Sequence, residues 1–302
     1  MLDKLIYDQR EEIRDKAISV VAELRTVVRE AEKEHIMKLT LEMAHDDLDK
    51  QRESAAKLLN ELAPDMGQQL CECFIVKEIR SLGMDEYSNV RCTVVKNLLN
   101  VSKNVSMDCF SMQIFPLYDN LTKDKEERVR KTCAETVAEI AKVSPLDRIS
   151  QQLQDLYFRF LQDPTSRIVR GTAFQNIGPF IASFKDVCGI DNRITHFFVS
   201  TTEKTNNKDV CYYASYNFPA FIWVSGRDDW DRFRRLYLKL TSVNDFQTKK
   251  TLAASIHELA RILGPEITDR DLIDILDKFL KDNNNEVRVN ALKNLHVFLA
   301  EV

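Results

Sequence analysis

The stretch KDKEERVRKTCAETVAEIAKV, residues 123–143, combines an acidic turn with an amphipathic segment. Asp124 stands six residues before Arg130, and apolar residues follow three, seven and ten positions after that arginine. These offsets lie on one face of an α-helix. The stretch therefore predicts a helix that begins after an acidic turn, with the aspartate as its N-cap, and that buries one face.

The same pattern recurs along the chain at separations of 38 to 41 residues. The recurring basic position holds Arg14, Arg52, Arg91, Arg130, Arg170, Cys211, Lys249 and Arg288. The preceding acid recurs as Asp8, Asp46, Asp85, Asp124, Asp163 and Asp282. A further amphipathic segment lies ahead of these helices at 71–82, 110–121, 149–161, 230–240 and 271–280. Each unit is therefore predicted to be a helical hairpin.

Composition agrees with a helical protein. The 302 residues include only 7 Gly and 7 Pro, whereas 44% are hydrophobic and 30% are charged. Few turn-forming residues disfavour β-sandwiches, barrels and doubly wound folds. A period near 39 residues is similar to that of HEAT repeats, roughly 40 to 47 residues long. We expect an all-α protein, an α-solenoid (superhelix) of about eight HEAT-type two-helix repeats.

We expect a single solenoid domain over residues 1–302. The expected units are roughly 1–28, 29–66, 67–105, 106–144, 145–185, 186–225, 226–264 and 265–302. Terminal repeats of solenoids normally carry a polar outer face, and neither end shows an obvious one. The chain is therefore expected to be a slice of a longer solenoid or a short isoform.

Charge and cysteine usage restrict the partners. The net charge of −4 does not indicate a nucleic-acid partner. The N-terminus has no signal-like apolar stretch, and no apolar run approaches the roughly 18 residues of a membrane span. The seven cysteines are odd in number and form no Cys-x-x-Cys pair. This cysteine usage is typical of a cytoplasmic or nuclear protein, in which thiols stay reduced.

No catalytic constellation is apparent, so we expect no enzyme, no metal and no cofactor. The five histidines are spread over four of these units, and His257-Glu258 is the single His-Glu dyad in the sequence. No zinc-type spacing, phosphate loop or nucleophile motif is present. A metal-dependent helical-repeat enzyme remains the least favoured alternative.

The basic column has two interpretations. It could form a stripe for phosphate groups, or its members could pair with the aspartates of neighbouring turns as a structural ladder. The turns are mixed or acidic in charge, as in Asp124-Lys125-Glu126-Glu127. Nucleic-acid binding would need further basic and aromatic residues on the same ridge. The ladder is therefore the favoured interpretation.

Aromatic residues are dense between positions 212 and 230. The register places Phe218 and Phe221 in the core. Other aromatic residues and nearby arginines form a candidate protein interface, because such residues dominate binding hot spots: Trp223, Trp230, Arg227, Arg234 and Arg235. The alternative is that these side chains are structural as well.

Four runs in the second half of the chain resemble the HEAT-repeat regulatory and scaffold subunits of serine/threonine phosphatases. They are DPTSRIVRGTAFQNIGPFI (163–181), SYNFPAF (215–221), KKTLAASIHELARILG (249–264) and FLKDNNNEVRVNALKNL (279–295). Within this family they look most like the regulatory subunits of protein phosphatase 4. The scaffold subunit of protein phosphatase 2A is the related alternative.

The resemblance implies a non-catalytic subunit that binds a serine/threonine phosphatase catalytic subunit and directs its substrate choice. Phosphoprotein substrates or a further regulatory subunit are the other implied partners. The implied contacts lie in the turns within hairpins, at 46–51, 85–89, 122–128, 163–168, 204–209, 242–247 and 282–286. The candidate partner-binding residues are Lys123, Lys125, Arg167, Lys208, Trp223, Arg227, Trp230, Arg234 and Asn284. A transport or adaptor solenoid that binds a cargo peptide is the alternative from another class.

Overall fold

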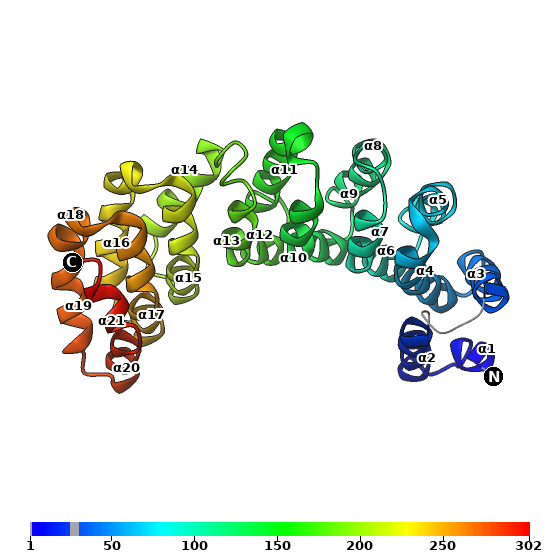
Figure 1. Cartoon of the computed structure of the whole chain (residues 1–302), viewed down its shortest axis with the longest axis horizontal. Coiled ribbons are helices and arrows are strands. Elements are labelled where there is room, and N and C mark those ends of the chain that lie inside the picture. The colour runs from blue at the N-terminus through cyan, green and yellow to red at the C-terminus, as the bar shows by residue number, and fades with distance from the viewer. Residues whose placement is uncertain (1, 25–29) are drawn as a thin grey trace. The chain divides into compact units, whose positions relative to one another are not determined.

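The fold consists of helical hairpins arranged in two compact units. The computed structural model describes residues 2–24 and 30–302, is 81% helical and shows no strand in these ranges. Most contacts between residues fall within one of two segments, Met1–Ile149 and Ser150–Val302, which we call the first and second unit. Within each unit, consecutive hairpins stack side by side (Figure 1). The predicted all-α solenoid of HEAT type is confirmed, and the eight repeat boundaries stay a prediction.

The first unit pairs short leading helices with longer second helices. Its leading helices are α1 (Leu2–Ile6), α3 (Glu30–Ala44), α5 (Val76–Leu82), α8 (Met107–Cys109) and α9 (Phe115–Leu121), and π-helical turns precede α5 and α9 at Cys71–Ile75 and Phe110–Ile114. Its second helices are α2 (Glu11–Leu24), α4 (Asp49–Leu70), α6 (Ser88–Lys96), α7 (Leu98–Lys103) and α10 (Glu127–Val143). Because α2, α4, α6 and α10 contact one another in that order, the second helices form one layer.

The second unit repeats this arrangement. Its leading helices are α11 (Leu146–Leu161, which begins just before the unit boundary), α14 (Asn192–Glu203), α16 (Trp230–Ser242), α18 (Pro265–Ile267) and α19 (Ile273–Leu280). Short turns of helix lie at Arg227–Asp229 and Thr268–Leu272. The second helices are α12 (Arg167–Gln175), α13 (Ile177–Ala182), α15 (Lys208–Ser225), α17 (Phe246–Leu263), α20 (Asn285–Lys293) and α21 (Leu295–Leu299). Contacts run from α13 to α15, α17 and α20, again as one layer.

The register identified from the sequence is the register of the core. The position three residues after the basic column is buried in all eight repeats, with at most 4% exposure: Ala17, Ala55, Val94, Cys133, Ala173, Ala214, Leu252 and Ala291. Small side chains there let neighbouring second helices approach closely. The predicted amphipathic hairpins therefore bury the face that the periodicity indicated.

At Arg52, Arg91 and Lys249, the basic column forms the predicted ladder, whereas Arg14 donates to Ser54 of the next hairpin instead. Arg52 Nε donates to Asp85 Oδ2 over 2.6 Å, and Arg91 Nε donates to Asp124 Oδ2 over 2.6 Å. Lys249 Nζ reaches Asp282 Oδ2 at 3.0 Å. Each pair joins the second helix of one hairpin to the turn of the next. The hydrogen bond to Asp124 raises the pKa of Arg91, and the side chains of this pair are less than a tenth exposed.

The same arginines also close their own turns. Arg52 Nη1 donates to the backbone oxygens of Asp46 and Asp47 at 2.8 and 3.0 Å. Arg91 makes the same pair of bonds to the turn that holds Asp85. One guanidinium thus satisfies turn carbonyls and a neighbouring carboxylate together, which suits its planar fork of donors.

The aspartates do not cap the second helices as predicted. Asp46 Oδ1 accepts a bond from Leu48 N at 2.8 Å, and Asp85 Oδ1 accepts one from Tyr87 N at 2.9 Å. The N-cap residues of α4 and α6 are Leu48 and Tyr87, whose side chains make no capping bond. The aspartates instead form the tight turn two residues before the N-cap, and the carboxylate of Asp85 also faces Arg52 of the preceding hairpin.

The sixth repeat lacks the arginine, and a lysine from the next hairpin takes over part of its role. Cys211 stands at the basic position and is buried. Lys239 of α16 donates to the backbone oxygens of Thr202, Glu203 and Thr205 at 2.7, 2.7 and 2.6 Å. These carbonyls belong to the C-terminal end of α14 and the turn after it, where a cation is favourable.

A buried asparagine locks two second helices together. Asn217 Oδ1 accepts a bond from Gly178 N at 2.9 Å, and its Nδ2 donates to the backbone oxygens of Gln175 and Tyr213 at 3.0 and 2.8 Å. A Cβ on Gly178 would lie 2.4 Å from Asn217 Oδ1, so glycine is required there. The Asn-Phe-Pro triplet at 217–219 is therefore a packing feature.

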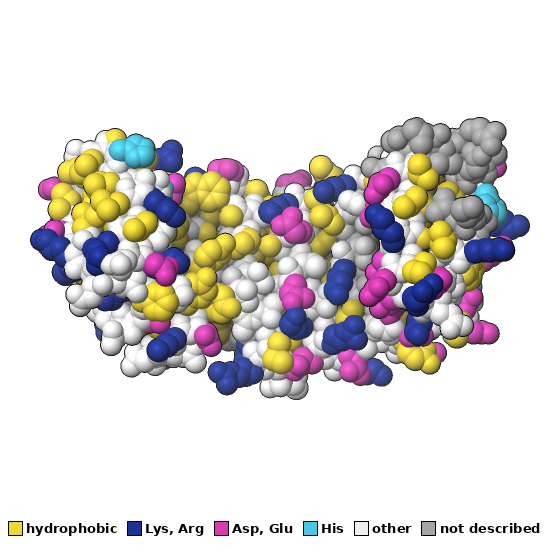
Figure 2. Space-filling view, turned by 90° about the horizontal axis from the view of Figure 1, so that it is seen from below, with side chains coloured by type: hydrophobic (Ala, Val, Ile, Leu, Met, Phe, Trp, Pro, Cys, Tyr) yellow, Lys and Arg dark blue, Asp and Glu magenta, His cyan; other side chains and the backbone are white. Residues whose placement is uncertain are grey.

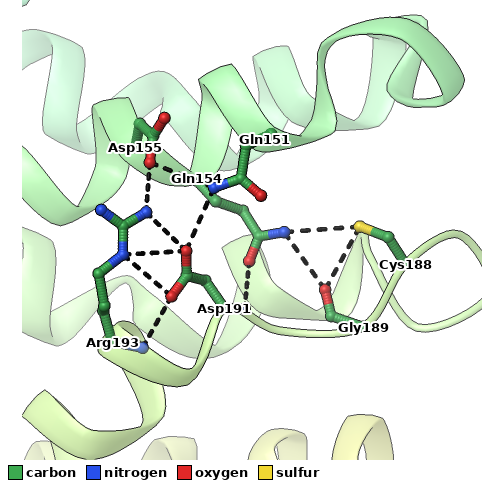
Figure 3. Close-up of polar contacts among 7 residues, drawn as sticks. All are labelled: Gln151, Gln154, Asp155, Cys188, Gly189, Asp191 and Arg193. Atoms are coloured by element: carbon green, nitrogen blue, oxygen red, sulfur yellow. Dashed lines mark hydrogen bonds and ion pairs between the residues drawn. The ribbon is translucent and has the colours of Figure 1, made fainter.

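A polar cluster anchors the loop that enters α14 (Figure 3). Its members are Gln151, Gln154, Asp155, Cys188, Gly189, Asp191 and Arg193. Gln154 is buried; its Oε1 accepts a bond from Asp191 N at 2.6 Å and its Nε2 donates to Gly189 O at 3.3 Å. Arg193 Nη2 donates to Asp191 Oδ2 at 2.6 Å and also to Asp155. The hydrogen bond from Arg193 is the main cause that lowers the pKa of Asp191 to about 2.

The cysteines are unpaired, as the reduced-thiol prediction requires. All seven are free, and five of them are buried. Burial raises the pKa of Cys71 to about 12, so its thiol stays protonated at neutral pH.

No helix among the described residues is long and apolar enough to span a membrane.

Replacing Lys239 by methionine is expected to lower the free energy of unfolding by about 2 kcal/mol, because three carbonyls lose a charged donor. Lys281→Met, at an exposed lysine paired with Asp277 on its own helix, is the control and should cost less than about 0.5 kcal/mol. Urea unfolding followed by circular dichroism measures both. Equal small losses would contradict the role given to Lys239.

Asp191→Asn is expected to lower the unfolding free energy by about 1 kcal/mol at pH 7. The folded-state pKa of Asp191 is about 2, below the usual 3.8 of an aspartate. Its carboxylate therefore stabilises the fold fully above about pH 4, and this contribution is lost as the pH falls toward 2. The difference between the urea midpoints of the variant and the parent should stay constant from pH 7 to about pH 4 and shrink as the pH falls toward 2. A difference independent of pH would refute the assignment.

Candidate partner-binding site

The exposed face of α15 carries two large aromatic side chains. Tyr216 is 61% exposed and Trp223 is 41% exposed. They are seven residues apart, or about two helical turns, and so lie on the same face. Figure 2, which views this side of the second helices, shows hydrophobic side chains gathered over the C-terminal part of the chain with lysines and arginines among them. The face has the composition of a protein interface.

Trp223 lines a groove of about 710 Å³ between α15, α17 and the end of the preceding hairpin. Its floor is apolar and its edges are charged: Lys185, Pro219, Ala220, Trp223, Gly226, Arg227, Glu258, Arg261 and Ile262. Lys185 Nζ lies 4.0 Å from the centre of the Trp223 ring, a cation–π contact. Gly226 has φ +82°, which lets the chain reverse at the end of α15 and brings Arg227 to the groove. We call this feature the Trp223 groove.

The Trp223 groove is locally basic. Three cations, Lys185, Arg227 and Arg261, line it together with one carboxylate, Glu258. Arg261 Nη1 lies 3.5 Å from Glu258 Oε2, and Arg227 Nη2 lies 4.0 Å from a carboxylate oxygen of Glu266. All four side chains of these pairs are about half exposed or more, so these pairings are weak.

Trp230 does not belong to a binding surface, and its proposed role is wrong. The side chain is 1% exposed and packs against Phe218 and Tyr237. Its Nε1 donates to Asp271 Oδ2 at 2.8 Å. Trp230 is the first residue of α16, and its ring faces the core because the helix turns its apolar stripe inward from that position.

Arg234 is also tied to the structure. Its Nε donates to Asp271 Oδ1 at 2.8 Å, although the arginine side chain is 47% exposed. Burial alone would raise the pKa of Asp271, but bonds from Arg270, Trp230 and Arg234 outweigh it and lower the pKa. Asp271 therefore joins the leading helices of the last two hairpins. Of the predicted patch, Trp223, Arg227 and the 89% exposed Arg235 remain free of this structural role.

Two of the predicted turn residues lie at a second groove. Arg167 lines a groove of about 700 Å³ formed by α12, α14 and α15, with Phe174, Phe197 and Tyr213 among its walls. Ile168 at its rim is 54% exposed. Lys208 is the exposed first residue of α15, between the lining residues Asn207 and Asp209. We call this feature the Arg167 groove.

The other turn residues are placed elsewhere. Lys123 and Lys125 are exposed in the turn between α9 and α10 of the first unit, where Lys123 Nζ donates to Asp119 at 2.6 Å. Asn284 is the N-cap of α20, and its side chain accepts a bond from Glu286 N at 2.8 Å. Asn284 thus already has a structural role, and the sequence-predicted residues do not converge on one site.

Sequence reasoning missed Lys185 and Arg261. Arg261 occupies the same repeat position as Trp223, twelve residues after the basic column, so comparing equivalent positions would have found it. Lys185 lies fifteen residues after Arg170, the basic-column residue of its repeat. Because α13 ends at Ala182, Lys185 lies beyond the helical part of the repeat, where the periodic pattern no longer applies. No group of three or more metal-ligating side chains occurs in the described part of the chain.

Comparison with known families shows which part of the chain resembles phosphatase regulatory subunits. Residues 214–302 match the family described as Protein phosphatase 4 regulatory subunit 1 middle domain. The resemblance is to regulatory subunit 1 of protein phosphatase 4. Residues 114–144 match the HEAT repeat. The predicted similarity to phosphatase regulatory subunits is therefore confirmed, and the matched segment contains most of the Trp223 groove.

Curated relatives support the same family. The chain is 41% identical over 96 residues to Serine/threonine-protein phosphatase 4 regulatory subunit 1 of Homo sapiens, and equally to that of Mus musculus. The alignment covers 32% of this chain and 10% of each relative. The chain thus matches about a tenth of the length of these relatives.

Solved structures show the fold alone. A structure titled YIBA_ECOLI aligns with a TM-score of 0.64 at 19% identity, covering 99% of this chain and 91% of that one. The karyopherin Kap121p, solved bound to the SUMO protease Ulp1p, aligns with a TM-score of 0.66 at 13% identity and covers 99% and 34%. Both likenesses are those of helical solenoids.

Trp230→Phe and Trp223→Phe form a matched pair, since these are the two tryptophans of the chain. Trp230→Phe is expected to lower the unfolding free energy by about 2 kcal/mol, because buried Asp271 loses a donor and the core loses volume. Trp223→Phe should change it by less than about 0.5 kcal/mol. Urea unfolding followed by circular dichroism compares them. A larger loss for Trp223→Phe would reverse the assignment of buried and exposed tryptophans.

Proposed function

We propose that this chain acts as part of a non-catalytic regulatory or scaffold subunit that binds a serine/threonine phosphatase catalytic subunit, that of protein phosphatase 4, and directs its substrate choice. The observation that carries the proposal is the 41% identity over 96 residues to subunits named as regulatory. The fold supports it, because the stacked hairpins of each unit offer repeated exposed turns and a layer of second helices for protein contacts.

The grooves of the second unit favour a protein partner. The Arg167 groove combines exposed Ile168 with aromatic walls and polar turn residues, the mixture expected of a protein interface. We propose that the catalytic subunit contacts this turn edge, with Arg167 and Lys208 among the residues it touches. Phosphoprotein substrates, or a further regulatory subunit, would then occupy surfaces that the catalytic subunit leaves open. The free thiols favour a cytoplasmic or nuclear location.

The alternatives have weaker support. Likeness to the karyopherin Kap121p is at 13% identity and extends to the fold alone, so a cargo-binding transport function has no residue-level support. The scaffold subunit of protein phosphatase 2A would use the same turn edge. The two phosphatase assignments differ in which catalytic subunit is retained, and a binding experiment separates them.

Immobilised full chain is expected to retain purified protein phosphatase 4 catalytic subunit in preference to the protein phosphatase 2A catalytic subunit. Arg167→Glu and Lys208→Glu should each weaken retention about tenfold without lowering thermal stability, because both side chains are exposed. Lys77→Glu, an exposed lysine on leading helix α5, is the matched control and should have no effect. Retention of neither catalytic subunit would overturn the proposal.

A further inference from the structure

The Trp223 groove has two properties that together specify a ligand. The indole of Trp223, with Pro219, Ala220 and Ile262, gives an apolar surface, and Trp223 stays 41% exposed. Lys185, Arg227 and Arg261 surround it, against one lining carboxylate. This local excess of positive charge stands out on a chain whose net charge is −4. The surface suits a ligand that brings an apolar side chain and negative charge together.

The cations of the groove can change partners at little cost. Arg227 and Glu266 approach only to 4.0 Å, with side chains 56% and 83% exposed. Arg261 and Glu258 approach to 3.5 Å and are 57% and 47% exposed. Exposed pairs of this kind contribute about 1 kcal/mol or less. An incoming carboxylate therefore has to displace only weak pairings of Arg227 and Arg261.

The apolar surface continues beyond the groove along α15. Tyr216, 61% exposed, lies about two turns from Trp223 on the same face. A small molecule in the groove would leave Tyr216 uncovered, whereas a peptide segment reaches both. Neighbouring helices pack about 10 Å apart, so about three extended residues cross from α15 to α17.

We propose that the Trp223 groove binds an acidic linear segment of a partner protein, with an apolar side chain against Trp223 and its Asp or Glu carboxylates beside Lys185, Arg227 and Arg261. Carboxylates are favoured over phosphate for a reason of charge. Glu258 and the neighbouring Glu266 offset two of the three cations, so the groove keeps a small positive charge that suits singly charged groups. This inference goes beyond the proposed function, since it concerns a different groove and does not require the catalytic subunit.

Peptide titration tests the proposal. The probe is a short fluorescein-labelled peptide of Asp and Glu residues around a central Leu-Phe pair, added to the full chain. Anisotropy should show saturable binding that weakens with added salt. An unlabelled copy should change tryptophan emission, because Trp223 is exposed and Trp230 is buried. Trp223→Phe should keep most of the binding and lose the emission change.

Variants locate the contact. Arg227→Glu and Trp223→Ala should each weaken peptide binding at least tenfold, whereas Lys208→Glu, at the Arg167 groove, should leave it unchanged. Peptides with Lys for the acids, or with Ala-Ala for Leu-Phe, should bind at least tenfold more weakly. Circular dichroism melting checks the fold of each variant, and Arg227→Glu decides the outcome if Trp223→Ala melts early.

Several results would overturn the proposal. Equal binding to parent, Arg227→Glu and Trp223→Ala would place the peptide elsewhere. Tighter binding of a phosphoserine peptide, or of a single-stranded oligonucleotide, would replace the carboxylate segment by another ligand class. Retention of the phosphatase catalytic subunit is measured in parallel on Arg227→Glu. Loss of peptide binding with intact retention supports this inference, and failure of retention by the parent chain bears on the proposed function alone.

Discussion

The bond between the basic residue of one hairpin and the aspartate of the next turn ties successive hairpins together at Arg52, Arg91 and Lys249. Arg91 is 6% exposed and binds both Asp124 and the carbonyls of its own turn. Removing one partner of such a pair leaves a buried charge, at a cost of about 3 to 5 kcal/mol. The pair thereby fixes the register of successive hairpins, while the small apolar residues beside it set how closely the second helices pack.

This use of the basic column also determines what is left for binding. Cations in the ladder are turned inward and occupied, as are Lys239 at the end of α14 and Arg234 beside Asp271. The cations available to a partner stand elsewhere: Lys185, Arg227 and Arg261 at the Trp223 groove, and Arg167 and Lys208 at the Arg167 groove. Some lysines and arginines thus stabilise the fold and others remain available for binding. The position of each residue in the repeat decides which of the two it does.

The periodicity of the sequence was sufficient to predict the fold, but it could not predict which residues form the partner-binding site. Helical offsets identified the buried column correctly, because burial on one face of a helix is a property of spacing. The spacing could not show that Asp85 would bond both its own turn and Arg52 of the preceding hairpin, since that depends on how the two hairpins pack. Trp230 and Trp223 are both aromatic and near arginines, and only packing against Phe218 and Asp271 separates the buried one from the exposed one.

Hydrogen–deuterium exchange of the full chain, with and without the protein phosphatase 4 catalytic subunit, tests the central claim most directly. Bound catalytic subunit is expected to slow exchange at the turns and second-helix starts around Arg167 and Lys208. The ladder-bearing second helices of the first unit should exchange as before. Slowed exchange confined to leading helices such as α5, or no change anywhere, would contradict the account.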